Sequence, residues 1–435
     1  MKQRISHLKQ HPSYDKAMHW GKLLSITGAA QLIVQIVGFA SGILIIRLLS
    51  TQEYALYTLT NTMLGAMTLL SDGGISTGVM AQGGKVWEDK EKLGSVMTTG
   101  LALRRKFALG SLMISLPILF YLLMHNGAGW LTSFLITISL IPAFFAALSD
   151  SLLEIPLKLH QNILPLQKNQ VYVGIGRLLL VGSTLFIFPF AYIAILAAGI
   201  PRIYGNLNLR KISNKFVDET KLPDPLIKKE ILIIVKRSLP AVVYYCLSGQ
   251  ITIWIISVFG NSTSVAQIGA LGRLAVLLNL VSVIFGTLIV PRFARIKNQD
   301  LRLRGIYSKI IAGFFVFGFF IVVFTWFFSD YLLWILGKNY AGLKTELTLM
   351  IIGSCINLIM SIGFSLYLSR GWILKPHISI SVSVMPIILG CFMFDISNLK
   401  GVLYLNSFVA LIQMILHVGF GFYKILKLEK KYQTN

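Results

Sequence analysis

The residue best suited to chemistry in an apolar setting is Arg273, within the segment IGALGRLAVLLNL. It lies about nine residues into a predicted membrane span, so a rise of 1.5 Å per residue places it roughly 13 Å deep in a hydrocarbon core about 30 Å thick. An arginine at that depth costs at least about 2.5 kcal/mol on insertion scales, so it should face protein or water. Two interpretations stay open: an anion contact in a central cavity, or a structural pair with a carboxylate or a helix C-terminus.

Five further arginines are candidates for the same cavity, and each has a structural alternative. Arg177 lies less deep, where its side chain could reach the cytoplasmic headgroups. Arg104 and Arg105 open one predicted span at its cytoplasmic end and Arg370 ends another, so anchoring at the interface is their alternative. Arg47 lies at the outer end of the first span, where basic residues are scarce.

Three carboxylates and one histidine are candidates for ion coupling. Asp72, Asp150 and Glu154 lie near the cytoplasmic ends of predicted spans, and the last two share a helix face because they are four residues apart. They can pair with basic neighbours, or one of them can take up a coupling proton. His417 could titrate near neutral pH, although a lone histidine on an apolar helix face is more often a satisfied core residue.

The motifs of metal sites and nucleotide-binding enzymes are missing. The 3 cysteines lie in apolar runs without a C-x-x-C pair, and the 7 histidines show no H-E-x-x-H spacing, so we predict no metal and no cofactor. There is no G-x-x-x-x-G-K-[ST] loop, which predicts a chain without an ATPase of its own. Basic loops account for the net charge of +23 and favour anionic membrane lipid, not nucleic acid, as the partner.

Composition places these candidates in an integral membrane protein. The chain is 55% hydrophobic and only 13% charged, with a mean hydropathy of +0.72, whereas soluble domains carry about 25% charged residues. Its long apolar runs must be helices, because lipid offers no partner for free backbone groups. We predict an all-α polytopic membrane protein of 12 transmembrane helices. The spans lie near residues 23–46, 54–72, 104–123, 130–153, 171–188, 190–206, 235–258, 264–291, 307–329, 343–368, 377–394 and 401–423.

The distribution of basic residues settles the ambiguous stretch 171–201, which is long for one helix and short for two. With two spans there, nearly all of the 40 basic residues fall on the side that holds the N-terminus. A single span would send the basic segment 202–237 across the membrane, which the positive-inside rule disfavours. We therefore expect both termini in the cytoplasm. The expected parts are a cytoplasmic N-terminal segment (1–22), an N-terminal lobe (23–206), a cytoplasmic linker (207–229), a C-terminal lobe (230–423) and a cytoplasmic tail (424–435).

A weak internal repeat supports two halves of six spans each. The sequence NGAG of residues 126–129 recurs as NYAG in residues 339–342, each in the outer loop between the third and fourth spans of its half. Both halves begin on the same side of the membrane, so the axis that relates them runs along the membrane normal. We expect two six-helix lobes around a central cavity that serves as the transport path.

Four segments resemble the polysaccharide-exporting branch of the multidrug/oligosaccharidyl-lipid/polysaccharide (MOP) flippase superfamily, the O-antigen flippases and their relatives. They are IIRLLSTQEYALYTL (Ile45–Leu59), SDGGISTGV (Ser71–Val79), VPRFARI (Val290–Ile296) and ILGKNYAG (Ile335–Gly342). The resemblance covers nearly the whole chain, and the order and spacing of the segments carry it.

The resemblance implies a flippase of the bacterial cytoplasmic membrane that moves an isoprenoid pyrophosphate-linked oligosaccharide to the outer leaflet by rocking of the two lobes. It implies glycosyltransferases and a polysaccharide polymerase as partners, and an ion gradient or product consumption as the driving force. Arg273 matches the expected location of a phosphate-binding residue by position, and arginine offers phosphate a fixed fork of donors.

Three alternatives are weaker. A drug or cation antiporter of the same superfamily would favour carboxylates in its cavity, but the first span holds no acid and the deepest charge is an arginine. A peptidoglycan-precursor flippase typically has two further spans. A membrane polysaccharide polymerase or ligase usually carries a large charged outer loop, whereas the outer loops predicted here are short.

Overall fold

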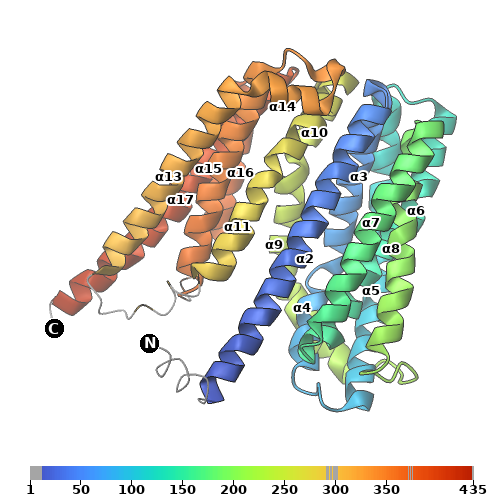
Figure 1. Cartoon of the computed structure of the whole chain (residues 1–435), viewed down its shortest axis with the longest axis vertical. Helices are drawn as coiled ribbons and strands as arrows, with labels where there is room; N and C mark the ends of the chain where they lie inside the picture. The colour runs from blue at the N-terminus through green and yellow to red at the C-terminus, as the bar shows by residue number, and fades with distance from the viewer. Residues whose placement is uncertain are drawn as a thin grey trace, which may run out of the picture. The chain divides into compact units, whose positions relative to one another are not determined.

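A computed structural model of the chain describes residues 12–290, 293, 296, 302–370, 372, 374 and 376–433. The described residues form helices and contain no strand (Figure 1). Eight of these helices are long and apolar enough to cross a membrane, judged by length and composition. Each of the 12 predicted spans coincides with a helix or a pair of helices. The fold is therefore that of an all-α, polytopic membrane protein.

The first six predicted spans correspond to six long helices, with one short helix between the second and the third. The helices are α2 (Pro12–Leu48), α3 (Thr51–Asp72), α4 (Ile75–Gly83), α5 (Lys90–His125), α6 (Trp130–Leu159), α7 (Ile163–Ile187) and α8 (Ala191–Ser213). The ambiguous stretch 171–201 divides at Pro189 into the end of α7 and the start of α8, which confirms two helices in this stretch.

The second half begins with α9, and its eighth span departs from expectation. The elements are α9 (Pro225–Phe259), α10 (Ser262–Ala275), α11 (Leu277–Leu288), α13 (Arg302–Phe327), α14 (Ser329–Leu336), η1 (Lys338–Tyr340), α15 (Lys344–Leu368), α16 (Pro376–Met393) and α17 (Leu399–Gln433). The sequence predicts one helix over 264–291, but α10 and α11 meet at Val276. The Asn279 amide donates to the Val276 carbonyl at 3.0 Å, and this three-residue spacing is a 3₁₀-type turn inside the span.

The chain divides into two compact units. Unit 1 comprises the described residues up to Glu53 together with Thr60–Gly249, and unit 2 comprises Tyr54–Leu59 together with the described residues from Gln250 on. The divisions fall inside α3 and α9, and none falls in the segment 207–229 that the sequence suggests as a linker. Residues 207–213 belong to α8 and 225–229 to α9, while α2 and α17 extend into the expected terminal segments.

The segment 214–224, between α8 and α9, packs against the first turns of α5. The Asp218 amide donates to the Lys90 carbonyl at 3.1 Å, and the Ser95 hydroxyl donates to the Leu222 carbonyl at 3.2 Å. A Cβ on Gly94 would overlap the main-chain oxygen of Asp218, so glycine permits this close approach. These contacts explain why a stretch of linker-like composition belongs to unit 1.

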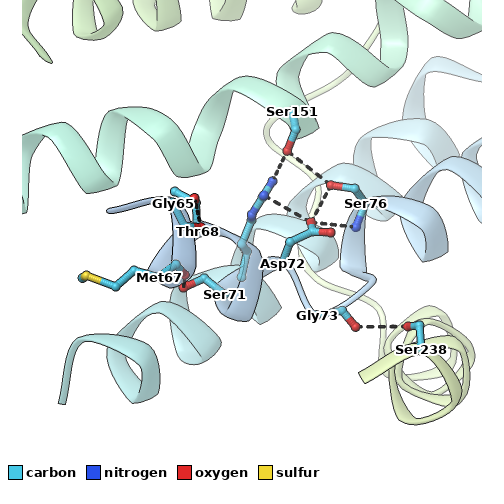
Figure 2. A network of polar contacts seen from close by, with 10 residues as sticks. Gly65, Met67, Thr68, Ser71, Asp72, Gly73, Ser76, Ser151 and Ser238 are labelled. Carbon is cyan, nitrogen blue, oxygen red and sulfur yellow. Dashed lines mark hydrogen bonds and ion pairs between the residues drawn. The ribbon is translucent and has the colours of Figure 1, made fainter. Parts of the chain in front are cut away.

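Two glycines in the left-handed conformation join α3 to α4. Gly73 has φ 51° and Gly74 has φ 98°, a region that side chains disfavour. The Ser238 hydroxyl of α9 donates to the Gly73 carbonyl at 3.1 Å (Figure 2). A Cβ on Gly74 would overlap the Ser238 Oγ and lie 3.1 Å from its Cβ. The turn and the approach of α9 therefore both require glycine.

We expect the substitution Gly74→Ala to destabilise unit 1 by about 3 kcal/mol, because it combines a strained φ with a steric overlap. The measurement is the thermal unfolding temperature of the purified protein in detergent. The control is Gly110→Ala on α5, where nothing lies within 4 Å of an added Cβ. That change should be neutral or slightly stabilising because alanine favours helix. Equal unfolding temperatures for the two variants would contradict the prediction.

Candidate functional site

The candidate site begins where one face of α3 meets one face of α10, both within unit 2. Tyr54, Tyr57 and Thr58 share a face of α3 because they are three and four residues apart, and Gly269 and Arg273 share a face of α10 in the same way. A Cβ on Gly269 would lie 2.6 Å from the Thr58 Oγ1, so the helices approach closely there. Arg273, one turn further along α10, then meets the two tyrosines.

The partners of the Arg273 guanidinium are tyrosine hydroxyls. Its side chain makes hydrogen bonds to Tyr54 and Tyr57, whose rings stack with centroids 6.1 Å apart. Tyr54 is only 1% exposed, so its ring and hydroxyl form a rigid support. The salt bridges among the described residues include none to Arg273. The alternative of a structural pair between Arg273 and a carboxylate is therefore not what the described residues show.

The place of Arg273 along α10 gives the distance on which its predicted membrane depth rests. Arg273 is eleven residues from Ser262, the first residue of α10, which corresponds to about 16 Å along the helix. The middle of a hydrocarbon core about 30 Å thick lies at a similar depth. Arg273 supplies a positive charge whose predicted depth is near mid-membrane, with N–H donors in a planar fork and neutral hydroxyls as its partners.

A cavity of about 400 Å³ with a mixed polar and apolar lining lies in unit 2, and Gly272, the residue before Arg273, is part of that lining. One face of α10 and α11 lines it, with Gly272, Asn279 and Ser282, and the polar residues Ser354, Asn357 and Ser361 of α15 line it from another side. Sequence reasoning missed this cavity, because Asn279 does not share a helix face with Arg273. The spacing of three and four residues in SCINLIMS (Ser354–Ser361) was a readable signal of a polar helix face.

A second cluster of polar groups lies in unit 1 and contains two of the candidates. Arg104 of α5, whose side chain is 6% exposed, forms an ion pair of 3.1 Å with Asp72 at the end of α3. Arg104 also donates to the Ser151 hydroxyl of α6. The Ser76 hydroxyl of α4 donates to Asp72 at 2.6 Å and lies 3.3 Å from that of Ser151 (Figure 2). This arrangement joins four helix segments through one buried ion pair.

The two acids on α6 also have basic partners. Asp150 accepts a hydrogen bond from Arg202 of α8, and Glu154 forms an ion pair of 2.7 Å with Lys158. Glu154 additionally accepts from the Gln170 amide at 3.0 Å. Pairing with basic neighbours, one of the two possibilities for these acids, is therefore present in the structure. A role in proton coupling stays a prediction.

The other arginines of unit 1 occupy different settings. Arg177 of α7 is half-buried, and its Nε donates to the Ser41 hydroxyl of α2 at 3.4 Å. Arg105 is exposed on α5, next to the buried Arg104. Arg47 is exposed in the last turn of α2. The structure thus brings Arg104 together with Asp72, while Arg105, its neighbour in sequence, lies on the surface.

Arg370 and His417 of unit 2 have partners of their own. Arg370 donates to the carbonyls of Phe293 and Ile296 at 3.1 and 3.0 Å, and its guanidinium lies over the Phe293 ring. His417 is buried, and its Nδ1 lies 2.8 Å from the Tyr367 hydroxyl. Arg370 therefore holds the main chain that follows α11, and His417 links α17 to α15.

Comparisons with known proteins identify the fold. The sequence matches no protein-family model and no curated protein. Among similar solved structures is an inward-facing multidrug resistance MATE family transporter of the MOP superfamily, with a TM-score of 0.71, 15% identity, and 91% of this chain and 96% of that chain covered. An outward-facing multidrug resistance MATE family transporter of the MOP superfamily has a TM-score of 0.63 and 14% identity. That match covers 94% of this chain and 95% of that chain.

A third similar structure is the lipid II flippase MurJ in an inward closed conformation. It has a TM-score of 0.71 and 14% identity, and the match covers 94% of this chain and 90% of that chain. Identities this low show shared architecture and not shared substrate. These similar structures are two transporters and a flippase, and the chain shares their fold.

Proposed function

We propose that this chain is a flippase for a lipid pyrophosphate-linked oligosaccharide in the bacterial cytoplasmic membrane, serving the synthesis of a surface polysaccharide such as O-antigen. The observation that carries the proposal is the Arg273 guanidinium, positioned by Tyr54 and Tyr57 and paired with no carboxylate among the described residues. A pyrophosphate cannot enter hydrocarbon without a compensating cation, and Arg273 is suited to supply it.

The tyrosines explain how Arg273 can serve a passing anion. Each hydroxyl accepts a hydrogen bond from the guanidinium and so orients it, yet neither neutralises its charge. An internal carboxylate would compete with the phosphate for the same donors. A cation held by neutral partners can exchange one anion for the next, which transport requires and a permanent ion pair prevents.

The charge of the site favours this function over a drug or cation antiporter. The fold does not decide between them, because the TM-score is 0.71 both to a MATE transporter and to the lipid II flippase. A site for cationic drugs requires an available carboxylate. In the described structure Asp72, Asp150 and Glu154 each have a basic partner, whereas Arg273 offers positive charge.

Reconstituted vesicles test the proposal directly. Wild-type protein in liposomes should translocate a fluorescent isoprenoid pyrophosphate-linked oligosaccharide, scored by the fraction that becomes accessible to a membrane-impermeant quencher. The same vesicles should not accumulate a cationic dye when a proton or sodium gradient is imposed. Accumulation of dye without movement of the glycolipid would contradict the flippase function and support the antiporter function instead. Imposing each gradient in turn would show which ion, if any, drives transport.

Removing one tyrosine hydroxyl should weaken transport moderately. We expect Tyr57→Phe to reduce translocation about 3- to 10-fold at subsaturating substrate, because one orienting hydrogen bond is worth about 0.5–1.5 kcal/mol. The control is Tyr172→Phe on α7, where the ring is 67% exposed and transport should be unchanged. Equal translocation rates for the two variants would show that the Tyr57 hydroxyl does not help to position Arg273.

A further inference from the structure

The cavity in unit 2 has an uncharged lining, which is not the lining expected of a site that binds an anion. Its volume of about 400 Å³ lies in the range of about 300–1,000 Å³ that is usual for small-ligand sites. The residues that line it include no charged side chain, and Arg273 is not among them although its neighbour Gly272 is. Its polar side chains are Asn279, Ser282, Ser354, Asn357 and Ser361.

The helical spacing of these polar residues lets α11 and α15 each present one polar face to the cavity. Asn279 and Ser282 are three residues apart on α11, and Ser354, Asn357 and Ser361 follow at three and four residues on α15. Residues at these spacings share a helix face. The 3₁₀-type turn at Val276 lies at the same place, and irregular backbone at membrane depth is tolerated where it lines a cavity or is buried in protein.

The hydrogen-bonding capacity of this lining is largely unused within the chain. The Ser354 hydroxyl donates to the Met350 carbonyl at 2.8 Å, which leaves its oxygen as an acceptor. The side-chain amides of Asn279 and Asn357 make no hydrogen bond to another described residue. Polar groups inside a span are costly unless they gain partners. An amide offers donors and an acceptor together, which suits hydroxyl groups that both donate and accept.

We propose that this cavity binds the hydroxyl groups of a neutral sugar in the transported glycan, while Arg273 binds the anionic linkage. The inference rests on the flippase function proposed above. The lining combines uncharged amides and hydroxyls with apolar side chains, among them Leu278, Leu358 and Met360. Such a lining suits a neutral polyol better than an anion or a cation. Gly272 lines the cavity and Arg273 is the next residue of α10, so the two proposed subsites are supplied by neighbouring residues of one helix.

Filling the cavity tests the proposal. A Cβ on Gly272 would meet nothing within 4 Å, so Gly272→Leu adds a side chain to open space and also favours helix. The matched control is Gly286→Leu on α11, where an added Cβ also meets nothing within 4 Å and which does not line the cavity. The cargoes are an isoprenoid pyrophosphate that carries a neutral oligosaccharide and the same isoprenoid pyrophosphate without sugar.

We expect Gly272→Leu to slow translocation of the glycosylated cargo about 10-fold, equivalent to losing roughly two hydrogen bonds, and to leave the sugar-free cargo unchanged. Asn357→Leu, which removes an amide at similar volume, should act in the same direction and serves if Gly272→Leu fails to fold. Gly286→Leu should match the wild type with both cargoes.

The possible results separate this proposal from the flippase function. Unchanged translocation of the glycosylated cargo by Gly272→Leu and Asn357→Leu overturns the sugar subsite and leaves the flippase function intact. An equal loss with both cargoes also overturns it, because the effect would not depend on sugar. A wild-type protein that moves neither cargo overturns the flippase function and this inference with it.

Discussion

Replacing Arg273 by glutamine should reduce translocation of the pyrophosphate-linked oligosaccharide by about 30- to 100-fold. A charge-assisted, bidentate contact to phosphate is worth about 2–3 kcal/mol, and glutamine keeps the polar shape but not the charge. The translocation rate of Arg273→Lys should lie between those of the wild type and Arg273→Gln, because an ammonium restores the charge without the planar fork. The measurement is the initial rate in reconstituted vesicles at matched protein density.

The stability of the Arg273→Gln variant distinguishes a transport role from a structural one. A structural arginine would lower the unfolding temperature when it is removed. A buried charge without a carboxylate partner is costly, so its removal should leave stability unchanged or raise it. The control is Arg304→Gln, since Arg304 is exposed on α13 and its loss should alter neither quantity. Wild-type translocation by Arg273→Gln would remove this residue from the mechanism.

The second large effect concerns the ion pair between Asp72 and Arg104. We expect Asp72→Ala to destabilise the protein by about 3–5 kcal/mol, because it leaves a buried guanidinium without its counter-charge. The Arg104 side chain is 6% exposed, and its Nε already lacks a hydrogen-bond partner among the described residues. Ser151 and Ser76 cannot replace the lost charge. The loss should appear as a lower thermal unfolding temperature in detergent.

A double variant supplies the decisive comparison. Asp72→Ala with Arg104→Met removes both charges and fills the space with an apolar chain, so it should recover most of the lost stability. The surface pair of Lys85 and Glu230, 3.5 Å apart and with both side chains more than half exposed, is the control. Glu230→Ala should change stability by no more than about 1 kcal/mol. If the double variant is no more stable than Asp72→Ala, the unpaired charge of Arg104 is not the cause of the lost stability.

The helices were predictable because their signals are local. Apolar runs located all 12 predicted spans on observed helices, although helices such as α5 (Lys90–His125) extend well beyond the predicted span of 104–123. The distribution of basic residues divided 171–201 into two helices, since orientation depends on loop charge and not on tertiary contacts.

The surroundings of the candidate residues were not predictable, because they depend on packing between distant segments. Tyr54 and Arg273 are more than two hundred residues apart, and helical periodicity does not show which faces of two helices meet. Likewise, the sequence near Arg104 and Arg105 does not show which of the two is buried. The cavity needed the polar faces of α11 and α15 to be recognised as facing each other.

The packing of residues 214–224 against α5 has a practical consequence for dissecting the molecule. With Pro223 and Pro225 among polar residues, this stretch looks like a convenient place to insert a reporter or to split the gene. Its main chain, however, is bonded to the Lys90 carbonyl and the Thr99 hydroxyl, and an insertion would break those bonds. The boundaries between the two units lie inside α3 and α9, where a cut would sever a helix. The protein therefore offers no suitable site for insertion or division at these places, and is best produced as one continuous polypeptide.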